Sequence, residues 1–397
     1  MKKVLIYLHK DELAPTGGPL GYNYNLLQGL NEIGLINENR SVDICFLPGR
    51  SISSNVNSKI NTIKNVRIKN AIKTLKSIYK KGNMLYGFKH VSEVDLNEYD
   101  AVHFHRTLDL YCVKDSLKDF KGKVILTSHT PTMPAKEVFS LLTDFEKKYM
   151  AWFYKRLPEI DEYAFDRADY IIFPCPEAEE PYYHEWPHYQ DVHDRNKGKY
   201  LYMPTGTGKK VAKKNRSDIR KKYNIPDDAF VVSYVGRHNE IKGYSDLKEI
   251  GNKILQKYSN IFFIIAGKEG PLFRLDNSRW IEVGWTNDPA SIINSADMFL
   301  LPNRETYFDL VMLEVLSLGQ IVLASNTGGN KYFSKFQQNG VILYTTNEEA
   351  EMEIEKILDM TEFERNSRRQ SNKELYEHKF TNKVFANNYL SLLGKIL

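Results

Sequence analysis

Short runs of β-branched and aromatic residues alternate with longer stretches of mixed polarity along almost the whole chain. The longer stretches have helical spacing, and continuous apolar runs separated by helices are typical of buried parallel strands in βαβ units. Nine runs predict strands: KVLIYLH, VDICFLP, AVHFH, KVILTSH, YIIFPC, FVVSYVG, FFIIAG, MFLLP and IVLAS. The sequence therefore predicts an α/β protein.

The alternation pauses in a segment rich in Gly, Pro and Lys, at residues 184–229, and a new series of strands begins at Phe230. The chain has 397 residues, which exceeds the ~250–300 at which one core usually stops growing. We therefore predict two doubly wound domains, at residues 1–208 and 209–379. Ligands of such folds bind outside the carboxyl ends of the strands, so the cleft between the domains is the expected site.

Glycines and cations follow two of the predicted strands. Gly17 and Gly18 precede a predicted helix, where backbone N–H groups approach an anion; a purely steric role in a tight turn is the alternative. Arg237 and Lys242 follow FVVSYVG, with Gly243 opening the next helix. A guanidinium and an ammonium placed there suit a pyrophosphate, and two solvated loop cations are the alternative.

Several stretches together resemble glycosyltransferase family 4, whose members are retaining enzymes with the GT-B fold and nucleotide-sugar donors. They are SYVGRHNEIKG, FIIAGKEG and SADMFLLPNRETYFDLVMLEVLSLGQIVLASNTGG, with YDAVHFH and VILTSHT upstream. The resemblance is good over about residues 230–335 and looser over residues 1–180. It implies two Rossmann-like domains that face each other across a cleft, with a C-terminal helix at residues 380–397 packing back on the N-terminal, acceptor-side domain.

The resemblance also implies roles for particular residues. Arg237 and Lys242 resemble the pair that holds the diphosphate of the donor. His129, which ends VILTSH, is similar to the histidine beneath the transferred sugar. Gly17 and Gly18 resemble the turn that admits the diphosphate. The catalytic candidates are therefore His129, Arg237 and Lys242.

The family's paired-glutamate motif has an altered register in this chain. Glu314 resembles the second glutamate, which binds the ribose hydroxyls of the donor. The family separates its glutamates by eight positions with Phe-Gly inside, and counting back eight from Glu314 reaches Thr306. Glu305 lies one position further out, and YFD places Asp309 where a glycine is expected. Either a one-residue bulge returns Glu305 to the sugar, or Thr306 presents its hydroxyl there.

The implied function is the retaining transfer of a hexose-type sugar from a nucleotide-sugar, with a UDP-sugar as first choice. The acceptor is a glycan, a glycoprotein or a lipid-linked molecule. The cations stabilise the leaving diphosphate, so neither a metal nor another cofactor is expected. Two alternatives stay open: a non-catalytic partner or scaffold subunit of a glycosylation complex, and a nucleotide-sugar epimerase.

The aromatic and histidine-rich stretch at residues 175–191 has two interpretations. Its Tyr and Trp faces suit stacking on acceptor sugars, and surface packing is the alternative. His184, His188 and His193 lie among prolines that break helical alignment, and no open-site motif occurs. We therefore expect no metal site there.

Composition and charge bear on partners and location. The net charge of +5 and the pI near 8.7 favour anionic small molecules or membrane surfaces over nucleic acid. Three scattered cysteines indicate a reducing compartment. No stretch reaches the ~18 apolar residues of a membrane span, so a cytoplasmic protein is expected. Residues 59–81 predict a basic amphipathic helix that lies on anionic lipid at the inner face of the membrane; a domain helix with solvated lysines is the alternative.

Overall fold

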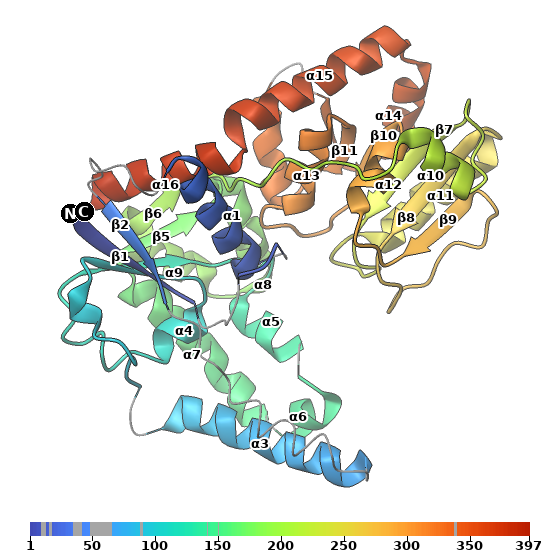
Figure 1. Ribbon diagram of the computed structural model, residues 1–397. Coiled ribbons are helices and arrows are strands. Elements are labelled where there is room, and N and C mark those ends of the chain that lie inside the picture. Colours follow the sequence, from blue (N-terminus) through green and yellow to red (C-terminus); the bar gives the residue numbers. More distant parts are fainter. Residues whose placement is uncertain are drawn as a thin grey trace.

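Two six-stranded parallel sheets form the centre of the molecule (Figure 1). The computed structural model describes residues 1–8, 13–15, 18–34, 42–47, 66–87, 90–140, 142–149, 151–336 and 340–397. The first sheet contains β1 (Lys2–Tyr7), β2 (Val42–Phe46), β3 (Ala101–Phe104), β4 (Lys123–Thr127), β5 (Tyr170–Phe173) and β6 (Tyr200–Tyr202). The second contains β7 (Phe230–Val235), β8 (Ile261–Ala266), β9 (Trp280–Gly284), β10 (Met298–Leu301), β11 (Ile321–Ser325) and β12 (Val341–Tyr344).

Helices cover both faces of each sheet, as two doubly wound domains require (Figure 1). The first domain has α1 (Pro19–Glu32), α3 (Val66–Tyr86), α4 (Thr107–Tyr111), α5 (Pro134–Ser140), α6 (Asp144–Tyr149), α7 (Ala151–Arg167), α8 (Glu180–Glu185) and α9 (Tyr189–Asn196), with the 3₁₀ turns η1 (Leu96–Glu98), η2 (Pro176–Glu179) and η3 (Lys197–Lys199). The second has α10 (Arg216–Lys222), α11 (Tyr244–Lys257), α12 (Pro289–Ser295), α13 (Leu310–Leu318), η4 (Gly328–Lys335) and α14 (Asn347–Asp359), and α15 (Glu362–Lys379) and α16 (Asn382–Ile396) end the chain.

The strands are largely apolar because helices pack on both faces of each sheet. On β1, Val4 and Ile6 join the core beneath α1 and α16, whereas Leu5 and Tyr7 join the core on the opposite face. Successive side chains of a strand point to opposite faces, so a strand covered on both sides must be apolar at every position. All nine predicted strands are present.

Strand order reverses once in each sheet. The orders are β2-β1-β3-β4-β5-β6 and β12-β11-β10-β7-β8-β9, so the chain changes direction between β1 and β3 and between β7 and β10. The second order is that of a Rossmann fold. Loops at the carboxyl ends of the two strands that flank such a switch point separate and leave a ligand crevice.

Three strands and part of the predicted linker differ from the sequence prediction. The sequence did not indicate β6, β9 or β12, which are all edge strands. The segment 184–229 was predicted to be a pause, but α9 and β6 lie within it and complete the first sheet. The extended connection between the domains therefore begins only after β6.

The C-terminal helix returns to the first domain. Figure 1 shows α15 running from the second domain toward the first, where α16 packs beside α1. Phe385, Tyr389 and Leu393 of α16 are fully buried against Leu26 and Leu30 of α1. The predicted return of the C-terminal helix is thus confirmed.

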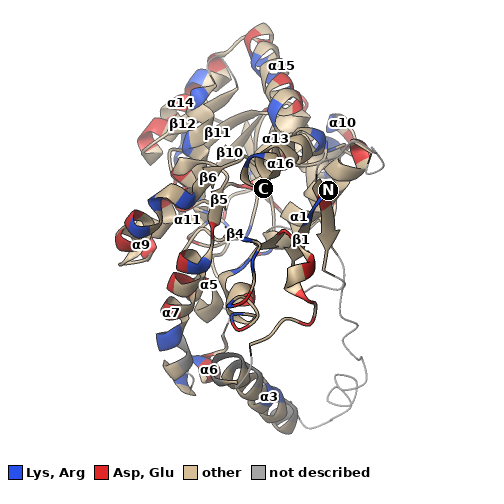
Figure 2. Cartoon of the chain, turned by 90° about the vertical axis from the view of Figure 1, so that its left-hand side faces the viewer, with Lys and Arg blue, Asp and Glu red and all other residues tan. Residues whose placement is uncertain are grey.

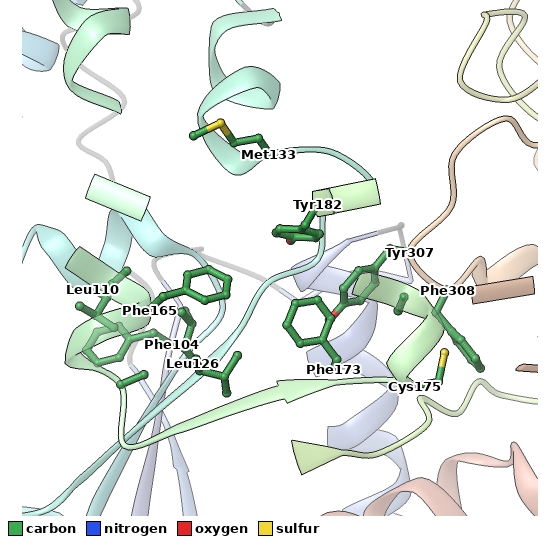
Figure 3. Close-up of a cluster of buried hydrophobic side chains, with 14 of the residues drawn as sticks. Phe104, Leu110, Leu126, Met133, Phe165, Phe173, Cys175, Tyr182, Tyr307 and Phe308 are labelled. Atoms are coloured by element: carbon green, nitrogen blue, oxygen red, sulfur yellow. The ribbon is translucent and has the colours of Figure 1, made fainter. Parts of the chain in front are cut away.

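Apolar side chains from both domains form one continuous core (Figure 3). Phe173 and Tyr182 come from the first domain, and Tyr307 and Phe308 come from the loop between β10 and α13. The ring centroids of Phe173 and Tyr307 lie 5.5 Å apart. We call this group the aromatic seam.

The aromatic stretch before α9 was predicted to offer faces for sugar stacking, and this interpretation is wrong for its largest rings. Tyr182, Trp186 and Tyr189 are at most 1% exposed and surround Phe165. They bury their faces in the core, so no sugar can stack on them. Tyr183 remains exposed.

We expect Gly29→Ala to destabilise the first domain. A Cβ at Gly29 would lie 2.0 Å from the carbonyl oxygen of Asn382, because α1 and α16 touch through their backbones. The clash outweighs the ~1 kcal/mol that alanine gains over glycine in a helix, for a net loss of about 1–3 kcal/mol. Thermal unfolding should shift down by several degrees.

Gly394→Ala is the matched control. It makes the same substitution inside α16, but a Cβ there meets nothing within 4 Å. Its melting temperature should stay unchanged or rise, and equal losses in both variants would contradict the backbone contact.

Candidate active site

The loops after β7 and β10 come together at the second switch point. Gly243 has φ 65°, and a Cβ at this position would lie 1.6 Å from the carbonyl oxygen of Pro302. The backbone N–H groups of Arg304 and Glu305 both donate to the carbonyl of Ile241, at 3.0 and 3.4 Å. Only glycine allows this approach, and it places the predicted cations against the predicted glutamate loop.

Lys242 is paired with Asp309 at this junction. The ammonium bonds to Oδ2 of Asp309, which also accepts from Nδ2 of Asn303 at 2.9 Å. Oδ1 of Asp309 caps α13 at the N–H of Val311. Burial by itself raises the pKa of Asp309, but the Lys242 ammonium and these hydrogen bonds outweigh it and hold the pKa below its ordinary value. The carboxylate is therefore ionised.

Arg237 leaves its guanidinium exposed to solvent at the same junction. Its carbonyl accepts from the hydroxyl of Tyr234 at 2.9 Å, which fixes the turn after β7. Within the part of the chain that the structure describes, its side chain makes no ion pair. Of the two predicted cations, Arg237 is thus ready for an anion, and Lys242 is already engaged.

Glu305 reaches across to the first domain. Its Oε1 lies 3.0 Å from Nδ1 of His184 on α8, and its buried Oε2 has no hydrogen-bond partner among the described residues. Burial raises the pKa of Glu305, and the nearby His184 opposes that effect. Thr306, by contrast, is 2% exposed and lies under Gly328.

A second set of contacts joins α8 and η2 to the turn after β11. Glu180 accepts from the N–H of Gly328 at 3.2 Å and forms an ion pair with Lys331. Glu177 pairs with Lys335 at 2.8 Å. These contacts, with the His184–Glu305 pair, fix how the two domains meet beside the aromatic seam.

His129 belongs to a cluster at the carboxyl ends of β3 and β4. Its Nε2 lies 2.9 Å from Nδ1 of His105, and the ring of Tyr22 packs against it at 4.8 Å. Tyr307 of the second domain approaches to 6.2 Å between ring centroids. Burial lowers the pKa of His129 to about 3, so its ring is neutral near pH 7.

Orphaned polar atoms converge on this cluster. The hydroxyls of Tyr22 and Tyr307 and Nε2 of His105 are buried without a hydrogen-bond partner in the described part of the chain. Buried polar atoms are normally satisfied. Their convergence at the first switch point therefore indicates a place where a polar ligand completes the bonding.

Gly18 lies one turn before Tyr22, at the N-terminus of α1. It has φ 72°, and a Cβ there would meet nothing within 4 Å, so the approach to the helix N-terminus is open. Gly17 lies outside the described residues.

Glu314 lies apart from these groups, on the second turn of α13. Its Oε1 pairs with the ammonium of Lys210 in the interdomain connection at 3.0 Å. Lys210 also donates its backbone N–H to the hydroxyl of Ser317. The structure thus places His129 and Gly18 at the first switch point and Arg237, Lys242 and Glu305 at the second. Glu314 lies beside the interdomain connection.

Several residues at the junction had no signal in the sequence as partners of the predicted ones. His184 and His105 contact the predicted Glu305 and His129 through space rather than through a motif. Asn303 contacts Asp309, the partner of the predicted Lys242. Among the described residues, no group of three or more His, Cys, Asp or Glu side chains is arranged to hold a metal ion.

Known proteins resemble this chain most clearly in its second domain. Residues 215–374 match the family described as "Glycosyl transferases group 1". The O-antigen biosynthesis glycosyltransferase WclY of Escherichia coli is 29% identical over 119 residues, which is 28% of this chain and 33% of WclY. The Escherichia coli UDP-Gal:α-D-GlcNAc-diphosphoundecaprenol α-1,3-galactosyltransferase is 27% identical over 142 residues, 32% of this chain and 36% of that enzyme. The chain thus spans about a third of the length of each of these relatives.

The fold extends over the whole chain. The sucrose-phosphate synthase of Thermosynechococcus elongatus superposes with a TM-score of 0.63 at 18% identity, covering 100% of this chain and 99% of that one. The predicted GT-B fold is confirmed. The family match lies within the second domain, and the named relatives that resemble part of this chain are glycosyltransferases.

We expect Glu305→Gln to raise thermal stability near neutral pH. The folded pKa of Glu305 lies above its ordinary value because burial penalises the charged form. The cost of the carboxylate to stability therefore accrues as the pH rises above the ordinary pKa and is complete above the folded pKa. Glutamine removes the cost, on the order of 1 kcal/mol for a buried group with an unmet bond.

The gain should shrink as the pH falls from about 8 toward the ordinary glutamate pKa of about 4.3, where the parent protein also becomes neutral at this position. Glu32→Gln, at an exposed position on α1, is the control and should change nothing. A pH-independent gain would contradict the burial of the Glu305 charge.

Proposed function

We propose that this protein is a retaining glycosyltransferase of family 4 that transfers a hexose-type sugar from a UDP-sugar. One observation carries the proposal: the second Rossmann switch point presents Arg237 and Lys242, and the neutral His129 cluster lies across the aromatic seam from it. A cationic pair suits the diphosphate of a donor, and a neutral polar cluster suits a sugar.

The chemistry that we propose is transfer on one face of the sugar. Bond cleavage builds positive charge on the sugar and negative charge on the departing diphosphate, which Arg237 and Lys242 stabilise. The diphosphate itself takes the proton of the acceptor hydroxyl on the same face. His129, neutral and held by His105, positions the sugar and is not a general base.

The carboxylate oxygen that Glu305 leaves unpaired in the described part of the chain favours this residue over Thr306 as the sugar ligand. Glu305 keeps a carboxylate oxygen without a partner, whereas Thr306 is buried beneath Gly328. Glu314 is proposed to bind the ribose hydroxyls after Lys210 releases it. Because Arg237 and Lys242 supply positive charge at the junction, we propose that no divalent metal is needed.

The proposed acceptor is a glycan, a glycoprotein or a lipid-linked molecule in bacterial glycan biosynthesis. One relative is named for a UDP-galactose donor and a diphosphoundecaprenol-linked acceptor, which supports a UDP-sugar and a lipid-linked acceptor for this chain as well. The bacterial context follows from both named relatives.

A panel of nucleotide-sugars tests the proposal. The protein is incubated with each donor, and free sugar, isomerised sugar and nucleotide are separated. A transferase without acceptor leaks some free sugar, an epimerase produces an isomer, and a scaffold subunit produces neither. Isomer, or no reaction with any donor, would refute the proposed activity.

We expect Arg237→Ala and Lys242→Ala each to reduce turnover about 10²–10³-fold, the usual cost of one lost charge-stabilising donor. Arg237→Ala should retain the parent melting temperature, whereas Lys242→Ala should lower it because Asp309 loses its counter-ion. Addition of EDTA should leave the parent activity unchanged. Lys221→Ala, at an exposed position on α10, is the control for loss of a positive charge. Near-parent turnover in both variants would contradict the diphosphate assignment.

Contact with a membrane through α3 is a separate part of the proposal. The predicted helix at residues 59–81 is present over residues 66–81 and continues to residue 86; residues 59–65 lie outside the described part. Its inner face is held by Ser77, which donates to Glu146 of α6, and by Ile78 in the core. No helix in the described part of the chain is long and apolar enough to cross a bilayer.

The outer face of α3 carries two adjacent rows. Exposed apolar side chains follow helical spacing, at Ile68 (52%), Ile72 (36%), Leu75 (66%) and Tyr79 (76%). The exposed Lys73 and Lys76 each follow one of these apolar residues in the sequence. Residues 66–86 include six Lys or Arg and no acid, whereas Figure 2 shows acids and bases interspersed on α9, α14 and α15. An apolar stripe beside a cationic row suits an anionic lipid surface.

We expect Lys73→Gln with Lys76→Gln to weaken binding to phosphatidylglycerol vesicles roughly 20–30-fold, from ~1 kcal/mol per lysine near an anionic surface. Leu75→Ser with Tyr79→Ser should weaken it as strongly, and neutral vesicles should bind poorly. Phe363→Ser, at an exposed aromatic of α15, is the matched control. Vesicle co-sedimentation measures each affinity, and parent binding by both α3 variants would refute the contact.

A further inference from the structure

The carboxylate of Asp309 stands inside the proposed diphosphate site. It contacts the Lys242 ammonium from one side, and the donor would contact the same ammonium from another. This inference rests on the proposed function, because it concerns how that site releases its nucleotide.

Asp309 is held too firmly to move aside. Its Oδ2 accepts from Lys242 and Asn303, and its Oδ1 accepts from the N–H of Val311 as the cap of α13. The side chain is 13% exposed. A carboxylate anchored by three donors, on two loops and on α13, keeps its place when a ligand arrives, so a diphosphate must share Lys242 with it.

The capping role has a second electrostatic effect. A helix N-terminus attracts anions through its free N–H groups and its dipole. At α13 the Asp309 carboxylate already occupies that position. Its charge is fixed at the position where a bound phosphate would otherwise be stabilised most by the helix. The same charge repels any phosphate bound at Lys242.

The repulsion acts unequally on substrate and product. In a nucleotide-sugar the terminal phosphate is esterified and carries one negative charge. After transfer the same phosphate is free and approaches two charges near neutral pH. A fixed carboxylate therefore destabilises the bound nucleoside diphosphate more than the bound nucleotide-sugar.

We propose that Asp309 is a positioning residue that holds Lys242 for the departing diphosphate and, by its charge, favours release of the nucleoside diphosphate product over release of the donor. Arg237, which is exposed and makes no ion pair in the described part of the chain, provides the initial attraction for both ligands. Lys242 then adds a second contact to the diphosphate, and Asp309 weakens the binding of that diphosphate more strongly once the sugar has left.

Asp309→Asn tests the proposal, because asparagine keeps the helix cap and removes the charge. Calorimetry measures the affinities of UDP and UDP-galactose, or of the nucleotide pair that the donor panel selects. UDP should bind at least tenfold more tightly than to the parent protein, and the nucleotide-sugar less than threefold more tightly. In steady-state assays UDP should inhibit the variant more strongly, with kcat lowered and the KM for donor little changed.

Asp246→Asn is the matched control. Asp246 pairs with Arg304 at the same edge of the second domain and does not contact Lys242. It should leave the ratio of the two affinities at the parent value. The same tightening in Asp246→Asn would show a general charge effect and overturn the proposal.

Two further outcomes distinguish failure of this inference from failure of the proposed function. An unchanged affinity ratio in a folded Asp309→Asn protein overturns this inference and leaves the glycosyltransferase proposal intact. Failure of the parent protein to bind any nucleoside diphosphate overturns both. A melting temperature within a few degrees of the parent value establishes that the variant is folded.

Discussion

Burial of Tyr307 and Phe308 between the two domains is the constraint on which the geometry of the site depends. The two rings are 8% and 7% exposed and lie within the aromatic seam. An aromatic side chain buries ~150–250 Å², and at about 25 cal/mol per Å² each ring contributes roughly 4–6 kcal/mol as an upper bound. The partly exposed ion pairs beside them contribute ~0–1 kcal/mol each. The apolar contact therefore determines where the loop lies, and the polar groups adapt to it.

Because the two rings are buried, the acidic side chains on either side of them point in opposite directions. Glu305 precedes the rings and reaches His184 in the first domain, whereas Asp309 follows them and reaches Lys242 in the second. One short loop thus presents a half-satisfied carboxylate to the interdomain junction and a fully anchored one to the cation. An ordinary Phe-Gly at this place would have provided neither the second buried ring nor the second charge.

The central strands were predictable because they are covered on both faces, which makes their buried positions a nearly continuous apolar run, as from Val4 to Tyr7 of β1. The missed strands β6, β9 and β12 are partly exposed edge strands, so their sequences lack that signal. An edge position alone does not hide a strand, because β2 is also a partly exposed edge strand and its apolar run was recognised. The aromatic content of this stretch also led to a wrong prediction. Trp186 and Tyr189 are residue types that commonly stack on sugars, but their faces are covered in the folded protein, which the sequence does not reveal. The loops that hold the candidate site follow strand ends, which the pattern located. The Lys242–Asp309 pair joins residues 67 positions apart, and no local pattern encodes such a contact.

The return of α16 has a consequence for biosynthesis of the protein. The core beneath β1 is completed by Phe385, Tyr389 and Leu393, close to the end of the chain. Domains usually fold as units in the order in which the ribosome releases them. Here the first half emerges with that core open, while all strands of the second sheet are contiguous and already synthesised before α16 appears. The nascent chain can thus complete its second sheet first, and the N-terminal domain closes only after α16 has been synthesised.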